Sequence, residues 1–450
     1  MKSALILNTI IVNENKTNKG SVLIKNGLIE EIYPGVNTVP EEIINQSEVI
    51  DASGKILIPG IIDDHVHFRQ PGLETKGTIY TESIAAIAGG VTSFMEMPNT
   101  VPQTINHVRL EEKFALAKEN SFANYSFYLG ATNENIEEIV KSNPSEICGV
   151  KAFLGSSTGN MLLNNKETLA NLFRESPLPI AAHCEDESII KNNLAHYTSL
   201  YGQNIPVDYH PKIRSEEACY KSSSSAIELA EKYGSKFHIL HLSTEKELNL
   251  FNSQINRKDK KSTSEACIHH LWFNDKDYNT YGTRIKWNPA IKSEKDRVSL
   301  LMGLKENQID LIGTDHAPHT LKEKSQPYTQ APSGGPMIQH SLQAMLEFYY
   351  NNILSLTEIV DKMCHAPADI FNVRKRGYIK KGYYADLVLV ELHKSYKVDQ
   401  NNLLYKCKWS PMENYTFKSS ITHTFVNGIL VFENGKINNI KAAQKLEFDR

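Results

Sequence analysis

Through the middle of this 450-residue chain, short apolar runs rich in β-branched and aromatic residues alternate with helix-like segments. The runs predict buried strands, and segments 104–120, 214–233 and 293–307 have the apolar spacing of amphipathic helices. About eight strand–helix units in succession are typical of a (β/α)8 barrel of the TIM type, in the α/β class. The predicted strands lie in "ILIPGIIDDH", "VTSFMEMPN", "ANYSFYLGA", "CGVKAFLG", "LPIAAHCED", "KFHILHLST", "TSEACIHH" and "IDLIGTDHAP".

The residue pattern at both ends of the chain differs from the pattern in the middle. Residues 1–56 contain short strand-like runs with Gly and Asn breaks, and residues 373–450 return to that pattern in "YADLVLVELHKSYKV" and "ITHTFVNGILVFENGKI". Two segments that are both rich in predicted strands are able to pair with each other in one sheet. We therefore expect 1–56 and 373–450 to form one small β-sandwich domain beside a barrel domain at 57–372.

Composition narrows the class of protein. The hydrophobic share of 40% and the charged share of 22% are those of a soluble globular protein. A net charge of -3 does not favour nucleic acid or membrane as a partner. The six cysteines form no CxxC pair, and the first residues lack both a basic leader and a cleavage site. We expect a cytoplasmic protein with reduced thiols.

Histidines and an aspartate occupy the carboxyl ends of the predicted strands. His65 and His67 are two residues apart, so in a strand both imidazoles point to one side and can bind one cation. A satisfied core pair explains an isolated HxH equally well. His183, His241 and Asp315 end three other predicted strands, and a barrel gathers such ends on one face. Together these five residues favour a metal site, with ligands that suit zinc.

Lys151 ends another predicted strand, where an ammonium beside metal ions would be repelled. A desolvated lysine can lose its charge, and its neutral amine can take up carbon dioxide to form a carbamate. The carbamate would offer two anionic oxygens to a metal pair. The alternative is a lysine whose ammonium reaches solvent.

Seven motifs resemble, in order and over about residues 57–372, those of dihydroorotases in the amidohydrolase superfamily: "DDHVHFRQPG", "MEMPNTVP", "GVKAFLGSSTGNML", "AAHCEDE", "LHLSTEKE", "WNPAIK" and "GTDHAPHT". The flanking β-domain is also in family order. This resemblance implies two Zn²⁺ ions per chain, with Lys151 as a carboxylated bridge and Asp315 as the catalytic acid/base. The implied ligands are His65, His67, Lys151, His183, His241 and Asp315.

Arg69 lies two residues beyond His67. A planar guanidinium can hold a carboxylate through two parallel hydrogen bonds, and dihydroorotate carries a carboxylate whereas hydantoin and dihydropyrimidine do not. A surface salt bridge is the alternative role for a single arginine. The resemblance further assigns substrate contacts to His67, Asn99, Asn288, His319, Ser333 and Gly334.

The implied activity is the reversible cyclisation of N-carbamoyl-L-aspartate to (S)-dihydroorotate, in pyrimidine synthesis. Hydantoinases, dihydropyrimidinases and allantoinases share the barrel and the metals, so they stay open as alternatives. A non-catalytic scaffold is a further alternative, but such chains typically lose metal ligands, and all six positions are filled here. The expected partner is a small-molecule substrate, with no nucleic acid and no membrane; a homodimer is left open.

Overall fold

The computed structural model describes residues 3–155 and 161–450, so part of the motif "GVKAFLGSSTGNML" (156–160) lies outside the described residues. Its centre is an eight-stranded sheet in the order β13-β12-β11-β10-β9-β8-β7-β6, with all neighbours parallel. A bridge from Val66 to His316 brings the last strand back to the first, which nearly closes the barrel. The strands are β6 (Ile61–Val66), β7 (Val91–Glu96), β8 (Asn124–Gly130), β9 (Gly149–Phe153), β10 (Ile180–His183), β11 (Phe237–Ile239), β12 (Ser262–Cys267) and β13 (Leu311–Gly313).

Each barrel strand lies in one of the eight predicted runs, except that β6 and β12 each extend one residue beyond theirs, to Val66 and from Ser262, so the predicted barrel is confirmed. The strands lack a polar face because parallel sheets in this architecture are covered on both sides. In β8, for example, all seven residues of "NYSFYLG" are buried.

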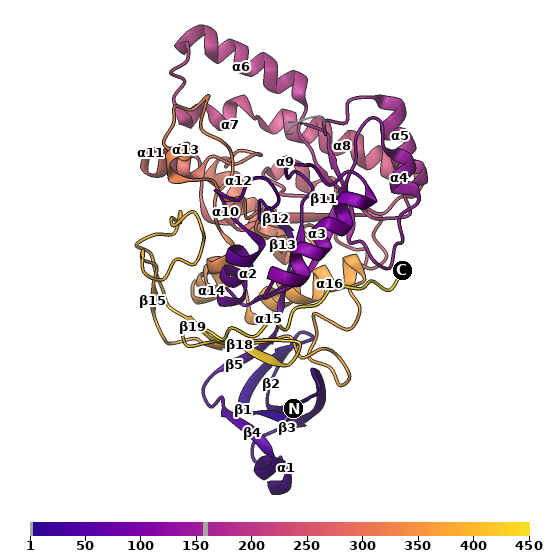
Figure 1. Cartoon of the computed structure of the whole chain (residues 1–450). Coiled ribbons are helices and arrows are strands. Elements are labelled where there is room, and N and C mark those ends of the chain that lie inside the picture. Colours follow the sequence, from indigo (N-terminus) through magenta and orange to yellow (C-terminus); the bar gives the residue numbers. More distant parts are fainter. Residues whose placement is uncertain (1–2, 156–160) are drawn as a thin grey trace.

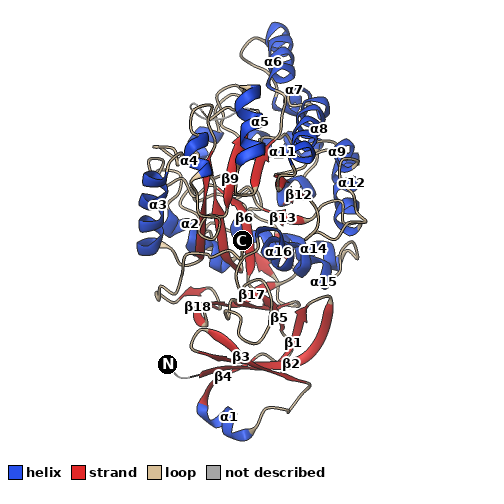
Figure 2. Ribbon diagram, turned by 90° about the vertical axis from the view of Figure 1, so that its right-hand side faces the viewer, coloured by secondary structure: helices blue, strands red, loops and turns tan. Residues whose placement is uncertain are grey.

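Helices surround the barrel (Figures 1 and 2). The helix predicted at 214–233 is α8 (Glu216–Tyr233), which starts at Ser215, whose hydroxyl accepts from the Ala218 N–H, and stops at Gly234 in the left-handed conformation. None of the helices in the described ranges has the length and apolarity to cross a bilayer. Besides α8, the α-helices of the described residues are α1 (Glu41–Gln46), α2 (Ile79–Ala88), α3 (His107–Asn120), α4 (Ile136–Val140), α5 (Lys166–Glu175), α6 (Glu187–Tyr201), α7 (His210–Ile213), α9 (Glu245–Leu248), α10 (Ile268–Trp272), α11 (Tyr278–Tyr281), α12 (Glu294–Lys305), α13 (Leu321–Lys324), α14 (Ser341–Tyr350), α15 (Leu356–Val360) and α16 (Ala366–Phe371).

The two ends of the chain form one nine-stranded sheet, seen below the barrel in Figure 2. Its order is β19-β18-β17-β14-β5-β1-β2-β3, with β4 paired to β1. The C-terminal β14 pairs with the N-terminal β5, so the two ends come together as predicted. The strands are β1 (Ser3–Asn13), β2 (Lys16–Lys25), β3 (Leu28–Pro34), β4 (Ser47–Asp51), β5 (Ile56–Pro59), β14 (Leu387–Glu391), β17 (Ser420–Val426), β18 (Ile429–Glu433) and β19 (Lys436–Ile437). A separate two-stranded antiparallel sheet pairs β15 (Tyr396–Lys397) with β16 (Thr416–Phe417).

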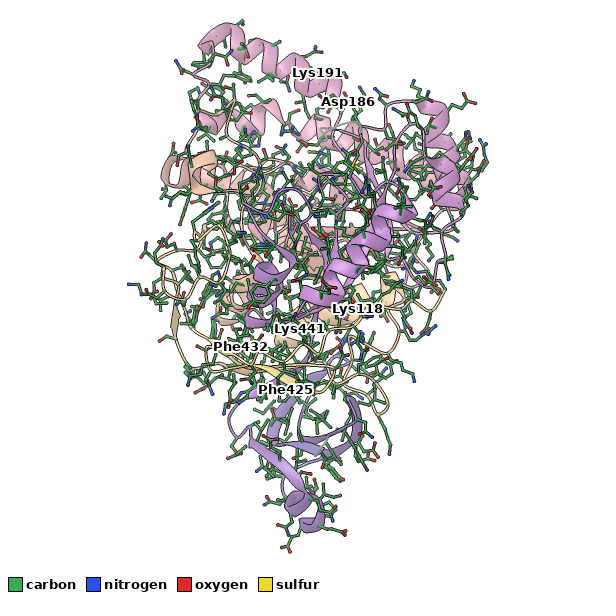
Figure 3. The ribbon with its side chains drawn as sticks, in the orientation of Figure 1. Lys118, Asp186, Lys191, Phe425, Phe432 and Lys441 are labelled. Carbon is green, nitrogen blue, oxygen red and sulfur yellow. The ribbon has the colours of Figure 1, made fainter. Side chains whose placement is uncertain are left out.

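The terminal sheet shares its packing with the barrel. Phe425 packs in the apolar cluster of the terminal sheet, whereas Phe432 on the next strand packs in the main cluster of the barrel. Both side chains lie where the two parts meet (Figure 3). β5 also leads into β6 through Gly60, where an added Cβ would lie 2.0 Å from the Thr92 hydroxyl oxygen.

A buried polar network fastens this junction. The Arg376 guanidinium pairs with Asp386 and donates to the Asn427 side-chain oxygen at 2.8 Å. Asn124, at the start of β8, donates to Asp386 at 3.2 Å and accepts from the Asn427 amide at 2.7 Å. Arg376 and Asp386 are each 3% exposed, so removal of either one would leave an opposite charge buried without its partner.

We predict that Asp386→Asn lowers the free energy of unfolding by about 3 to 5 kcal/mol, because it leaves the buried Arg376 charge without its partner. Urea denaturation followed by tryptophan fluorescence measures the change. The control is Arg374→Gln, which removes an exposed arginine that pairs with Glu447 and Asp449 and should cost under about 1 kcal/mol. Equal, small effects of the two substitutions would show that the network does not fasten the junction.

Candidate active site

The carboxyl ends of the barrel strands surround a cavity of about 330 Å³. Every residue that the sequence predicted for the site lines this one cavity: His65, His67, Arg69, Asn99, Lys151, His183, His241, Asn288, Asp315, His319, Ser333 and Gly334. Of the described residues, Phe153, Trp287, Ala317 and Pro332 also line it. The barrel closure therefore gathers residues that are up to 269 positions apart, from His65 to Gly334.

Two imidazoles and one carboxylate converge on a single point. His65 Nε2 and His67 Nε2 lie 3.3 and 3.2 Å from the same Asp315 oxygen. On the far side of its ring, His65 Nδ1 donates to Glu265 at 2.9 Å, and His67 Nδ1 donates to the Asn99 oxygen at 2.7 Å. Each neutral ring has only one proton, so both Nε2 atoms present lone pairs to the carboxylate.

Three buried acceptors at such a point need a cation among them. Burial lowers the pKa of both His65 and His67 well below the usual range, so the rings do not supply the charge as imidazolium. The ligand atoms of His65, His67 and Asp315 lie within 4.8 Å of one another, and nitrogen and carboxylate oxygen are ligands that divalent metals accept. The donor set therefore fits a metal ion.

A second histidine pair lies beside the first. His183 Nδ1 is 3.0 Å from His241 Nε2, and the other His183 nitrogen is 2.9 Å from a Glu185 oxygen. Glu185 pairs in turn with Arg214. His241 Nδ1, among the described residues, has no hydrogen-bond partner. Because the two facing nitrogens are 3.0 Å apart, they are placed to share a second cation.

Lys151 lies between barrel strands with only 1% of its surface exposed. Burial is the main cause that lowers the pKa of its ammonium to about 8. Among the described residues no carboxylate forms an ion pair with it; its ammonium lies 4.7 Å from the centre of the Phe153 ring. The Lys151 ammonium therefore does not reach solvent, which was the alternative role for this residue.

Three site residues have positive φ angles that side chains rarely adopt. Arg69, His241 and Asp315 have φ of 74°, 45° and 44°. The left-handed region costs a residue with a Cβ free energy, and it persists where surrounding contacts hold it. At these positions the backbone turns at the strand ends and aims the side chains at the cavity.

Arg69 contributes a guanidinium to the cavity wall. Its Nε donates to the Pro318 carbonyl at 3.0 Å, and Nη2 lies 3.0 Å from His319 Nε2. It is 7% exposed, and no carboxylate of the described residues forms an ion pair with it. Burial lowers the pKa of Arg69 to about 10, so the guanidinium still carries its charge at neutral pH. The surface-bridge alternative for Arg69 does not fit this buried position.

The segment around Gly334 forms the opposite wall. The Ser333 hydroxyl donates to the Asn288 oxygen at 2.9 Å, and the Gly334 N–H donates to the Lys286 carbonyl at 2.9 Å. Gly334 has a φ of 118°, and an added Cβ would meet the Ala317 carbonyl oxygen at 2.7 Å. The Gly334 N–H is thus engaged within the protein, and the wall approaches the cavity because this position has no side chain.

The sequence analysis missed several residues that hold the site. Glu265 accepts from His65 and also from the His241 backbone N–H at 2.8 Å, so it connects both histidine pairs. In the sequence, Glu265 stood out only as a carboxylate within a predicted apolar strand. Trp409, far along in the C-terminal segment, donates from its indole to the His319 carbonyl at 2.7 Å. No local pattern marked Trp409 for this role.

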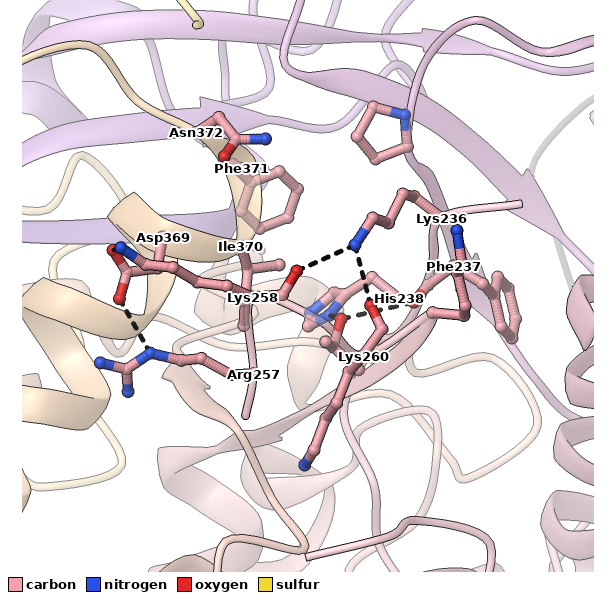
Figure 4. Close-up of a pocket in the computed structure, with 13 residues that line it drawn as sticks. Lys236, Phe237, His238, Arg257, Lys258, Lys260, Asp369, Ile370, Phe371 and Asn372 are labelled. Carbon is pink, nitrogen blue, oxygen red and sulfur yellow. Dashed lines mark hydrogen bonds and ion pairs between the residues drawn. The ribbon is translucent and has the colours of Figure 1, made fainter. Parts of the chain in front are cut away.

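A basic pocket at the opposite end of the barrel is a structural cluster (Figure 4). Arg257 pairs with Asp361 and Asp369, and Lys260 pairs with Asp310. Lys236 donates to two backbone carbonyls, at 3.2 and 3.0 Å. Because these cations are already engaged and the cavity measures about 40 Å³, the chemistry belongs to the cavity at the carboxyl ends.

Comparison with known proteins agrees with this assignment. Residues 56–431 match the amidohydrolase family. A dihydroorotase from Methanosphaera stadtmanae is 30% identical over 438 residues, covering 97% of this chain and 98% of the relative, and one from Ehrlichia chaffeensis is 33% identical over 425 residues, covering 93% and 92%.

Solved structures agree on the fold. An L-hydantoinase (dihydropyrimidinase) from Arthrobacter aurescens superposes with a TM-score of 0.92 at 25% identity, covering 99% of this chain and 100% of the other. A dihydropyrimidinase from Brevibacillus agri gives 0.88 at 22% identity, covering all of both chains (100% each). With its family match over most of its length and relatives at 30% identity or more over nearly all of it, the chain belongs to the amidohydrolase family, among the dihydroorotases.

Proposed function

We propose that this chain interconverts N-carbamoyl-L-aspartate and (S)-dihydroorotate at a binuclear metal site, as a dihydroorotase of pyrimidine synthesis in the cytoplasm. The observation that carries the proposal is the buried Arg69 guanidinium, which lacks a carboxylate partner among the described residues and lines the same cavity as the histidine–aspartate cluster. The near full-length curated relatives carry the same activity in their names.

Arg69 favours an anionic substrate over a neutral one. A buried charge is costly unless an opposite charge meets it, and the carboxylate of dihydroorotate would supply that charge when it enters the cavity. Hydantoin and dihydropyrimidine rings without a carboxylate would leave Arg69 unpaired. The similarity to hydantoinase structures reflects a shared barrel fold, whereas Arg69 would select the substrate by its charge.

We propose two Zn²⁺ ions held by the predicted ligands. His65, His67 and Asp315 would hold one ion, His183 and His241 the other, and Lys151, as a carbamate, would contribute an oxygen to each. Its burial and its lack of a carboxylate partner among the described residues support this role for Lys151. The chemistry that such ions supply is polarisation of a carbonyl and a lower pKa for an attacking water.

The protein's own residues would orient the substrate and move the proton. Arg69 would fix the ring by its carboxylate and thereby set the ring amide over the histidine cluster. Asp315 lies at the cavity wall, where its carboxylate can take the proton that the attacking water gives up and return it to the ring nitrogen. Ring closure would use the same proton in the opposite direction.

Arg69→Lys should lower kcat/KM for dihydroorotate roughly 10- to 100-fold and leave the metal content unchanged, because one charged hydrogen bond worth about 1.5 to 3 kcal/mol is lost. Steady-state assays with dihydroorotate, hydantoin and allantoin, together with elemental analysis, measure both quantities. Unchanged kinetics for dihydroorotate, or faster turnover of hydantoin than of dihydroorotate by the unmodified protein, would contradict the proposed substrate.

Asp315→Asn should keep the fold and most of the metal yet lose nearly all turnover in both directions. The amide oxygen can still act as a ligand, but it cannot accept a proton. Activity in each direction, compared with metal content, separates the two roles of Asp315. If excess zinc restores turnover, Asp315 serves only as a ligand.

The purified chain should contain close to two zinc-like ions, and Lys151 should be carboxylated. Elemental analysis gives the first quantity, and electron density at Lys151 gives the second. Lys151→Met is the matched variant, since it keeps an apolar stem of similar length but cannot form a carbamate, and it should lose metal. Density for an unmodified lysine that points away from the histidines would refute the carbamate.

A further inference from the structure

We propose that Lys76, which lies outside the cavity lining, is a positioning residue that sets the tautomer of His319 and so keeps Arg69 free for the substrate carboxylate. Lys76 lies in the loop between β6 and α2. The inference deepens the proposed function and rests on it, because it concerns how the same cavity recognises a carboxylate.

Three groups face the two ring nitrogens of His319. The Lys76 ammonium lies 3.1 Å from Nδ1. The Ser333 carbonyl oxygen and Arg69 Nη2 each lie 3.0 Å from Nε2. The ring is 7% exposed, so these contacts largely replace water.

The bonding capacity of these groups selects one tautomer. An ammonium only donates and a carbonyl oxygen only accepts, so Lys76 requires a lone pair on Nδ1 and Ser333 requires a proton on Nε2. The neutral tautomer with its proton on Nε2 meets both requirements. The opposite tautomer satisfies Arg69 alone, since it directs an N–H at the Lys76 ammonium and a lone pair at the Ser333 carbonyl. Burial, and then the charges of Arg69 and Lys76, lower the pKa of His319 well below the usual range, which disfavours the imidazolium.

The selected tautomer leaves one donor of Arg69 unsatisfied. In this tautomer His319 Nε2 carries a proton and has no lone pair, so Arg69 Nη2, which lies 3.0 Å away, cannot donate to it. The His319 N–H stays with the Ser333 carbonyl, and Arg69 Nη2 is left to donate to a carboxylate that enters the cavity. Without Lys76, His319 could change tautomer and accept from Arg69, which would then be engaged within the protein and not by the substrate carboxylate.

Lys76 is itself held in place. Its ammonium pairs with Glu323 at 2.9 Å, and Glu323 accepts from the N–H and the hydroxyl of Thr320 at 2.9 and 2.8 Å. These bonds cap α13, so the carboxylate that orients Lys76 belongs to a fixed helix start. The ammonium therefore reaches Nδ1 from a fixed direction.

The test compares Lys76→Met, which keeps the stem and removes the donor, with Lys76→Arg, which keeps a charged donor. Lys246→Met is the matched control, because Lys246 forms an exposed pair with Glu217. Ring ¹⁵N chemical shifts of His319 in the metal-loaded protein, assigned with His319→Gln, report the tautomer. Binding of orotate, with uracil as the ring that lacks the carboxylate, reports recognition.

Lys76→Met should move the proton of His319 from Nε2 to Nδ1, weaken orotate binding roughly 10-fold and raise KM for dihydroorotate by a similar factor while kcat changes less than about 2-fold. Lys76→Arg and Lys246→Met should keep the original tautomer and affinity. If Lys76→Met keeps the Nε2 proton, the inference is overturned, whatever happens to binding. If Lys76→Met does not fold, a changed tautomer or a loss of orotate affinity in the folded Lys76→Arg protein overturns it.

Failure of the proposed function would give a different set of results from failure of the Lys76 inference. In that case the unmodified protein would neither turn over dihydroorotate nor bind orotate more tightly than uracil, whereas the ¹⁵N shifts would still show whether Lys76 sets the His319 tautomer.

Discussion

The site depends on one buried carboxylate, that of Glu265 in β12. It accepts from the His65 ring and from the His241 backbone N–H, so one side chain fixes a member of each histidine pair. A carboxylate that is fully buried is costly unless such donors surround it. The requirement works in both directions. The barrel must close for Glu265 to meet its donors, and His65 needs Glu265 to present its Nε2 lone pair to the cavity.

The fold was predictable because its signal repeats along the chain. Eight apolar runs with helical segments between them leave few architectures other than a barrel, and the structure confirms it. The site residues were also predictable from the sequence, because a barrel brings the carboxyl ends of all its strands to one face. They include His65, His183, His241 and Asp315. In both cases periodicity or position within a strand carried the information.

The supporting contacts were not predictable in this way. Glu265, Lys76 and Trp409 act through partners that lie far away in sequence, and their roles follow from distances of about 3 Å that only the closed structure defines. A lysine in a polar loop has no local pattern that separates it from a solvated one. The same holds for the direction of a ring proton, which depends on all groups around the ring.

The contact from Trp409 to the His319 carbonyl has a consequence for the order of assembly. A ribosome makes all the strands of the barrel before it reaches residue 409, so the barrel can close while this wall of the cavity still lacks its support. A nascent chain would then hold the histidine cluster before it holds the finished carboxylate pocket. The order of synthesis thus separates the two halves of the site in time.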